Sequence, residues 1–321
     1  MHSFSELASQ FAAYFDKEHF PAAPQTLYNP ARYFLGLGGK RVRPVACLMG
    51  NELFDDLKQD TWNVAVAIEL FHNFTLIHDD IMDKAPLRRN KETVHQKYGE
   101  STALLAGDVM LVAAYEYLNK ARNSGATQIF NIFNKTAKEV CEGQQLDMDF
   151  EQSPDVNFDA YLHMINLKTS VLLGACMQLG ALIGGAGARN QNLIYEFGRK
   201  LGLAFQVQDD YLDAFGDPEK FGKQVGGDIL ANKKTFLLIH ALETVTGEQR
   251  ETLQNLLRET APGKVHGVLK LFKQCGVDAW AMELKDRFMQ EALQHLDDIA
   301  VLSKRKEPLK QLALFLTQRE H

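Results

Sequence analysis

Apolar residues recur at spacings of three and four along most of the 321-residue chain, and this periodicity restricts the fold more than any other feature. It is sustained over many turns at residues 103–121, 129–150 and 192–215. Such spacing gathers apolar side chains on one face of a helix. Alternation of apolar and polar residues is almost absent, and no Asn-Gly or Asp-Gly pair marks a hairpin. The sequence therefore predicts an all-α fold.

The breaks between the helical runs are short, and no linker or clean repeat divides the chain. We therefore expect residues 1–321 to form a single large helical domain with a sizeable core. Residues 169–188 contain no charge and are long enough to span a bilayer, but five of them are glycines. This composition favours a buried helix over a transmembrane segment.

Charge and cysteine content restrict the partners and the compartment. The net charge of −6 argues against nucleic acid as the main partner, because phosphate backbones bind basic surfaces. The four cysteines lack the spacing of zinc ligands, and free thiols are typical of a reducing compartment. The first twenty residues show no basic start or cleavage site. We expect a soluble, cytoplasmic protein.

Asp79, Asp80 and Asp83 directly follow an apolar run and form a first acidic triad. Their spacing places all three carboxylates on one flank of a helix, where like charges cost roughly 0.2–0.5 kcal/mol per pair. Mg²⁺ would relieve this repulsion, since it binds one or two carboxylates and completes its shell with water and phosphate oxygens. A single cluster of this kind is, by itself, more often a solvated helix end.

A second acidic triad, Asp209, Asp210 and Asp213, has the same spacing and also follows an apolar helical run. Two triads on separate helices suggest two walls of one cavity. Basic residues, the usual diphosphate ligands, lie in loops close to each triad. They are Lys40, Arg41, Arg43, Arg88 and Arg89 near the first, and Lys223, Lys233 and Lys234 near the second. Together these residues predict a site for a metal–diphosphate complex.

In this order the motifs resemble those of the trans-isoprenyl diphosphate synthases, or polyprenyl synthetases. The matching stretches extend from Gly38 to about Thr235 and read GGKRVRP, ELFHNFTLIHDDIMD, LRR, EGQQLD, LKTS, GLAFQVQDDYLD, GK with GGD, and NKKT. The resemblance implies an isoprenoid synthase-type bundle around a deep central cavity. It also implies a Mg²⁺-dependent, homodimeric prenyltransferase of isoprene biosynthesis.

Such an enzyme joins isopentenyl diphosphate head to tail to an allylic diphosphate (dimethylallyl, geranyl or farnesyl) and releases diphosphate. The allylic C–O bond ionises, the isopentenyl double bond attacks the cation, and a proton is lost. The reaction needs cationic groups around the leaving diphosphate and a dry apolar pocket, but no protein nucleophile. The released diphosphate is the expected base.

The resemblance also implies roles for individual residues. The expected metal ligands are Asp79, Asp80, Asp83, Asp209, Asp210 and Asp213, with Asp147 close to a metal. The expected ligands of the allylic diphosphate are Arg88, Lys168, Lys223 and Lys233. Those of isopentenyl diphosphate are Lys40, Arg43, His72 and Arg89. Lys168, Thr169 and Gln206 would stabilise the developing cation, and Gln144 would line the cavity beside Asp147.

Product length in this family depends on bulk in the helix ahead of the first acidic triad. Phe74 lies five residues before Asp79, about 7.5 Å along a helix, with Phe71 one turn further back. An aromatic residue at this position, with small Thr75 next to it, resembles the geranylgeranyl-forming, archaeal-like pattern. A twenty-carbon product is therefore favoured, with the fifteen-carbon farnesyl diphosphate as the alternative. An ideal helical wheel nevertheless places His72 and Leu76 nearer the aspartates than Phe74.

Three other classes of protein share part of the pattern. A terpene cyclase has the first triad, but its second metal motif is usually not an aspartate triad. An HD-type metal phosphohydrolase would explain His72 and the pair His78–Asp79, but not the second triad or the basic loops. A non-catalytic regulatory subunit is disfavoured because both triads keep all their carboxylates.

Overall fold

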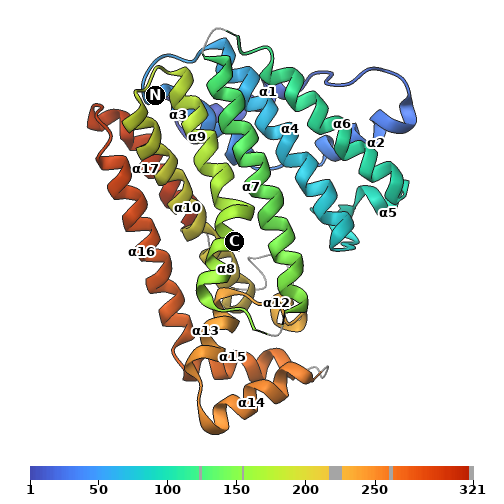
Figure 1. Ribbon diagram of the computed structural model, residues 1–321, viewed down its shortest axis with the longest axis vertical. Coiled ribbons are helices and arrows are strands. Elements are labelled where there is room, and N and C mark those ends of the chain that lie inside the picture. Colours follow the sequence, from blue (N-terminus) through green and yellow to red (C-terminus); the bar gives the residue numbers. More distant parts are fainter. Residues whose placement is uncertain (123–124, 154, 217–225, 260–262, 318–321) are drawn as a thin grey trace. The chain divides into compact units, whose positions relative to one another are not determined.

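Nearly all of the regular structure in the computed structural model is helical, which confirms the all-α prediction (Figure 1). The structure describes residues 1–122, 125–153, 155–216, 226–259 and 263–317. The helices from the N-terminus to the middle of the chain are α1 (Phe4–Phe15), α2 (Gln25–Gly36), α3 (Val42–Glu52), α4 (Gln59–Met82), α5 (Val94–Tyr98), α6 (Glu100–Leu118), α7 (Ala126–Gln152) and α8 (Phe158–Ile165). A π-helical stretch, η1 (Asn166–Ser170), joins α8 to the remaining helices. These are α9 (Val171–Ile183), α10 (Ala188–Phe215), α12 (Gly227–Leu230), α13 (Phe236–Thr244), α14 (Gly247–Arg258), α15 (Lys264–Gln274), α16 (Val277–Asp297) and α17 (Ser303–Thr317).

A short antiparallel hairpin of β1 (Leu87–Arg88) and β2 (Lys91–Glu92) follows α4, where the sequence carries no hairpin signal. Its turn residues, Arg89 and Asn90, have φ of 52° and 61°. Positive φ at both central residues is the requirement of a type I′ turn, which asparagine tolerates and arginine does not favour. The Arg89 guanidinium donates a hydrogen bond to the carbonyl of Gly38. This contact holds a turn that local preference alone does not encode.

The described chain divides into two compact units. The first comprises residues 1–133 and 176–192, and the second comprises residues 134–175 and 193–321. Helices α7, α9 and α10 each contribute residues to both units. That residues 1–321 act as one isoprenyl diphosphate synthase domain stays a prediction.

In the first unit, α4 packs along α6, and α3 packs against α4 and α1 (Figure 1). The C-terminal part of α9 lies against α3 at contacts that only glycine permits. A Cβ on Gly180 would meet the carbonyl oxygen of Cys47 at 1.9 Å, and one on Gly50 would meet that of Met177 at 2.4 Å. The glycines of the uncharged run therefore serve close helix packing.

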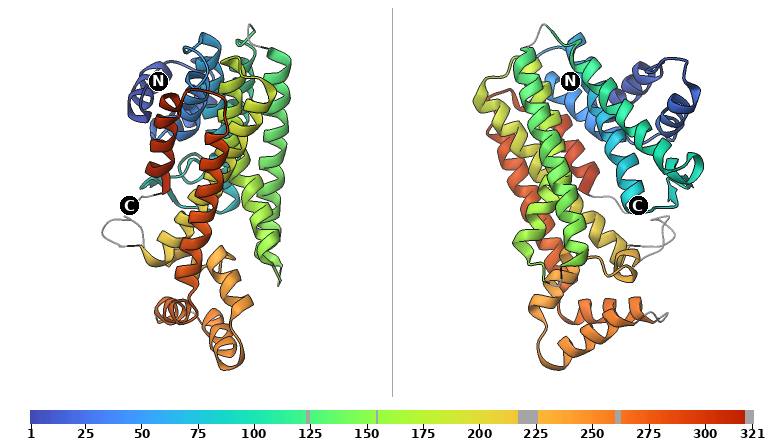
Figure 2. Two further views of the ribbon diagram at one scale, coloured as in Figure 1. Left: turned by 90° about the vertical axis from the view of Figure 1, so that its left-hand side faces the viewer. Right: turned by 45° about the vertical axis from the view of Figure 1, so that its right-hand side comes forward.

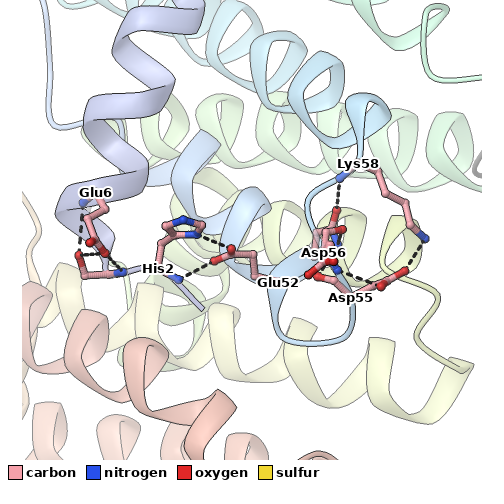
Figure 3. A network of polar contacts seen from close by, with 8 residues as sticks. His2, Glu6, Glu52, Asp55, Asp56 and Lys58 are labelled. Carbon is pink, nitrogen blue, oxygen red and sulfur yellow. Dashed lines mark hydrogen bonds and ion pairs between the residues drawn. The ribbon is translucent and has the colours of Figure 1, made fainter.

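Polar contacts fasten the chain on both sides of the C-terminal end of α3 (Figure 3). On one side, His2 Nδ1 lies 2.5 Å from Glu52 Oε1, and the His2 backbone N–H donates to Glu52 Oε2. A capping box between Ser3 and Glu6 then begins α1. On the other side, Lys58 Nζ lies 3.1 Å from Asp55. These contacts set where α1 begins relative to α3, and they limit the path from α3 into α4.

In the second unit, a buried apolar cluster forms between α8, the C-terminal half of α10, α13, α15 and α16. Tyr161 packs edge-on against Phe236 in this cluster, with ring centroids 4.7 Å apart. Helices α14 and α15 form an antiparallel pair beyond α13 (Figure 2). The cluster supports the end of α10, which carries the second acidic triad.

Residues 158–183 form the one stretch in the described ranges that is long and apolar enough, by length and composition, to cross a membrane. Of its most apolar window, 72% is buried inside the protein. This burial agrees with the prediction of a buried helix for the uncharged run at residues 169–188.

Candidate active site

The first acidic triad lies at the C-terminal end of α4. Asp80 is only 2% exposed, Asp79 is half-buried, and Asp83 is exposed as the C-cap residue. No basic residue lies in the last turn of this helix. The negative end of a helix dipole disfavours carboxylates and favours cations. Three carboxylates at this end are therefore unfavourable unless positive charge lies close to them.

The hairpin supplies part of that charge through Arg88. Its Nε lies 2.8 Å from both oxygens of Asp80, and its Nη2 lies 2.8 Å from Asp80 Oδ1 and 3.6 Å from Asp79 Oδ2. Burial raises the pKa of Asp80, and the bond to Arg88 opposes this rise. Arg88 is thus placed beside the carboxylates.

The loop that precedes α3 is held close to the hairpin in a strained conformation. Arg41, the N-cap residue of α3, has φ of 53° and forms an ion pair with the buried carboxylate of Glu69. Asn73 also donates to that carboxylate, at 2.8 Å. A Cβ on Gly39 would lie 2.8 Å from the Arg89 guanidinium. Strained backbone of this kind persists only where surrounding contacts hold it, and it gathers at functional sites.

Two further predicted diphosphate ligands meet within the first unit. Arg43 Nη1 lies 3.1 Å from His72 Nε2, and the buried Nε of Arg43 has no hydrogen-bond partner in the described structure. Burial, followed by the charge of Arg43, lowers the pKa of His72 well below its usual value. His72 is therefore a neutral acceptor, and Arg43 keeps a buried donor that an anion would satisfy. Lys40, in the loop that precedes α3, is exposed.

The three residues predicted to limit product length lie on α4 among aromatic rings. The Phe71 ring is 5.7 Å from the Phe74 ring and 5.2 Å from the Phe133 ring. Phe74 also packs edge-on against His78 at 4.7 Å. Thr75 turns its hydroxyl back to the helix and donates to the carbonyl of His72. Phe74 is half-buried, whereas Phe71 is 1% exposed.

The second acidic triad occupies the last two turns of α10, which likewise lack a basic residue in the final turn. Asp210 is 5% exposed, and both of its oxygens are held. The Tyr161 hydroxyl donates to Oδ2 at 3.2 Å, and the Gln206 amide donates to Oδ1 at 2.9 Å. Burial raises the pKa of Asp210 to about 7. This carboxyl group needs a nearby cation in order to ionise readily near neutral pH.

Asp213 is joined to the segment that follows α10. Its Oδ2 accepts a hydrogen bond from the Asp228 backbone N–H at 3.0 Å. Asp210, Asp213, Asp228 and Lys233 line one small pocket. Lys234 instead donates to the carbonyls of Phe150 and Ser153 at the end of α7. Lys223 lies outside the described residues, so its place in the site stays a prediction.

Lys168 and Thr169 belong to η1, and this irregular turn lies close to α7. Lys168 Nζ is 2.5 Å from Asp147 Oδ2 on α7. A Cβ on Gly143 would lie 2.2 Å from the backbone nitrogen of Lys168, so only glycine allows this approach. The buried Nε2 of Gln144 has no hydrogen-bond partner among the described residues. The structure thus brings together Asp147 and Lys168, two predicted site residues that come from different sequence motifs.

The donor set at the two triads fits a hard divalent cation that shares its shell with other oxygens. Within the described ranges, no three Asp, Glu, His or Cys side chains form a group that could hold a metal by themselves. Mg²⁺ commonly binds to one or two carboxylates and completes its shell with water and phosphate oxygens. Carboxylates at the negative ends of α4 and α10 suit that mode of binding.

Sequence reasoning missed two residues that hold this machinery in place. Glu69 is the buried partner of Arg41, and Tyr161 is the buried partner of Asp210. Glu69 lies ten residues before Asp79, within an apolar helical run. A buried carboxylate there requires a partner, and that was the available signal. Tyr161 carried no comparable signal, because its contact joins residues 49 positions apart.

The buried carboxyl of Asp210 predicts a pH-dependent stability for the metal-free chain. The ordinary pKa of an aspartate side chain is 3.8, whereas that of Asp210 in the folded chain is about 7. The stability that this group contributes is complete below about pH 4 and is lost as the pH rises through 7, by up to about 4 kcal/mol. Asp210→Asn removes this loss. In a chelating buffer, its melting temperature should rise relative to that of the wild type between pH 4 and pH 7, and then level off.

The exposed Asp155 offers a control for the same experiment, since Asp155→Asn should follow the wild type at every pH. A constant difference in melting temperature between Asp210→Asn and the wild type across this range would contradict the assignment.

Comparisons with known proteins identify the family to which the chain belongs. Residues 24–275 match the family model for polyprenyl synthetase. A geranylgeranyl diphosphate synthase of Methanosarcina mazei is 36% identical over 305 residues, which cover 93% of this chain and 91% of that protein. A geranylfarnesyl diphosphate synthase of Natronomonas pharaonis is 32% identical over 317 residues, covering 93% and 91%.

Among solved structures, a crystal structure of a geranylgeranyl pyrophosphate synthase superposes with a TM-score of 0.94. It is 42% identical in sequence, and the match covers all of both chains. The match to the family model and the similarity to these relatives each extend over most of the chain, and together they show that it is a prenyltransferase that belongs to the polyprenyl synthetase family.

Proposed function

We propose that the chain is a short-chain prenyl diphosphate synthase that condenses isopentenyl diphosphate with an allylic diphosphate and forms mainly geranylgeranyl diphosphate. The observation that carries this proposal is the pair of acidic triads at the C-terminal ends of α4 and α10, each with basic residues close by. Relatives named geranylgeranyl diphosphate synthase support the twenty-carbon product.

In this proposal the carboxylates of both triads hold Mg²⁺, which takes up charge on the allylic diphosphate when bound. Arg88, Lys168, Lys223 and Lys233 bind the same diphosphate. As its C–O bond breaks, these cations stabilise the negative charge that develops on the leaving group. The hydroxyl oxygen of Thr169 and the amide oxygen of Gln206 stabilise the allylic cation, and Asp147 orients Lys168 through their 2.5 Å ion pair.

Lys40, Arg43, His72 and Arg89 bind isopentenyl diphosphate in the proposal. The buried Nε of Arg43 supports it, because this N–H has no partner among the described residues and can donate to an anion. Glu69 fixes Arg41, the N-cap residue of α3, and thereby both the loop that carries Lys40 and the first turn of α3, which carries Arg43. The arrangement of the histidines speaks against a metal phosphohydrolase. His72 contacts Arg43, and His78 Nε2 lies 3.0 Å from the carbonyl of Leu104.

Removal of a triad carboxylate tests the metal assignment. Asp79→Ala and Asp209→Ala should each lower the rate of condensation at least a hundredfold, because the leaving diphosphate loses its metal. Circular dichroism and melting curves should remain close to those of the wild type. Labelled isopentenyl diphosphate with Mg²⁺ and farnesyl diphosphate measures the rate. Asp155→Ala is the matched control, and normal turnover in either triad variant would refute the assignment.

The half-buried ring of Phe74 is the proposed limit to product length. Phe74→Ala removes that ring and should shift the product from twenty carbons towards longer chains. Sizing the dephosphorylated alcohols by chromatography measures the shift. Phe71→Ala, one turn further from the triad and 1% exposed, should lower stability more than it changes the product. An unchanged product distribution in Phe74→Ala would exclude this ring as the limit. A fifteen-carbon product from the wild type would move the limit closer to the aspartates.

A homodimer and a cytoplasmic location complete the proposal. Leu104, Leu105 and Val112 are exposed on α6, and apolar side chains of this kind suit contact with a second copy of the chain. The four cysteines are all free, as is usual in a reducing compartment. Light scattering of the purified protein should give about twice the chain mass of 36.1 kDa. A mass equal to one chain would contradict the dimer.

A further inference from the structure

The hydroxyl of Tyr161 is placed so that it can act on the second acidic triad from outside it. Tyr161 is 2% exposed, and its ring is fixed edge-on against Phe236 with centroids 4.7 Å apart. Its hydroxyl donates to Asp210 Oδ2 at 3.2 Å. A buried hydroxyl without a partner is destabilising, because it has lost its hydrogen bonds to water. The contact is therefore one that the fold maintains.

Tyr161 and Gln206 hold the Asp210 carboxylate from two directions. Gln206 donates to Oδ1 from within α10, four residues away, and Tyr161 donates to Oδ2 from α8. An ionised carboxylate has about four acceptor sites, so two hydrogen bonds leave sites for a metal. Two fixed donors restrict rotation of the carboxylate and define the direction of those remaining sites.

Tyr161 also belongs to the same helical segment as Lys168. The two residues lie seven positions apart along α8 and η1, and each donates to a carboxylate on another helix, Asp210 on α10 and Asp147 on α7. The aromatic core beneath α8 includes Phe236, which packs against both Tyr161 and Phe158. The core thus anchors a segment that carries two donors to the site.

We propose that Tyr161 is a positioning residue that orients the carboxylate of Asp210 for Mg²⁺, an inference that rests on the proposed function. Donors that orient metal ligands typically change metal affinity or activity about 10–100-fold when they are removed. Tyr161 itself does not touch the reacting atoms in this proposal. Its loss therefore weakens Mg²⁺ binding more than it slows the reaction at saturating Mg²⁺.

Tyr161→Phe tests the proposal, because it removes the hydroxyl and keeps the ring against Phe236. The Mg²⁺ concentration that gives half of the maximal rate should rise about tenfold, whereas kcat at saturating Mg²⁺ should fall less than threefold. Titration with Mn²⁺, followed by electron paramagnetic resonance in the absence of substrate, should show the same loss of affinity. The melting temperature of the metal-free protein reports whether the variant is folded.

Tyr195→Phe is the matched control. Tyr195 is a half-buried tyrosine on α10, about four turns before Asp210. The Mg²⁺ requirement of Tyr195→Phe should equal that of the wild type. Tyr161→Met, which also lacks the hydroxyl but fills much of the ring volume, provides a second variant if Tyr161→Phe folds poorly.

The outcomes separate this inference from the proposed function. An unchanged Mg²⁺ requirement in folded Tyr161→Phe, or an equal rise in Tyr195→Phe, would overturn the positioning role and leave the synthase reaction intact. A wild-type chain that binds no Mn²⁺ and makes no prenyl product would overturn the proposed function itself.

Discussion

Carboxylates at the C-terminal ends of α4 and α10 are the constraint on which the rest of the site depends. Such groups are unfavourable there twice over, because they lie at the negative end of a helix dipole and because Asp80 and Asp210 are buried. Each therefore needs a donor or a cation. Arg88 meets this need at Asp80, and Tyr161 and Gln206 meet it at Asp210. Binding of a divalent ion would relieve the repulsion that remains between the carboxylates. The same groups would then affect both the stability of the fold and the binding of the metal.

The basic side of the first unit shows how strained backbone is stabilised by buried contacts. Arg41 and Arg89 both adopt positive φ, which costs arginine about 1–2 kcal/mol. Glu69 binds Arg41 from within α4, and the carbonyl of Gly38 binds Arg89. These contacts join the hairpin, the loop before α3 and the helix that carries the first triad. Arg88 therefore lies in a hairpin whose turn is stabilised by a tertiary contact, and Arg43 follows an N-cap residue that is held by a buried ion pair.

Much of the candidate site could be proposed from the sequence, because its charged residues occur in groups beside apolar helical runs. The spacing of the aspartates predicted their shared helix flank, and the ordered motifs predicted the family. The hairpin at residues 87–92 was not predictable, since Arg89–Asn90 is a poor type I′ turn until Gly38 binds Arg89. Tyr161 was not predictable either, because hydrogen bonding to Asp210 connects positions 49 residues apart. The periodicity of apolar residues predicts local geometry but does not predict contacts between distant positions.

The sequence by itself determined the helical class, the two acidic triads, the aromatic residues ahead of Asp79 and membership of the family, because each is a short-range pattern in residue type. Only the tertiary structure decided which partners these residues have. It paired Arg88 with Asp80, Arg43 with His72, Lys168 with Asp147 and Tyr161 with Asp210. The physical reason is that burial makes each polar group depend on a specific neighbour, and folding rather than sequence proximity selects that neighbour.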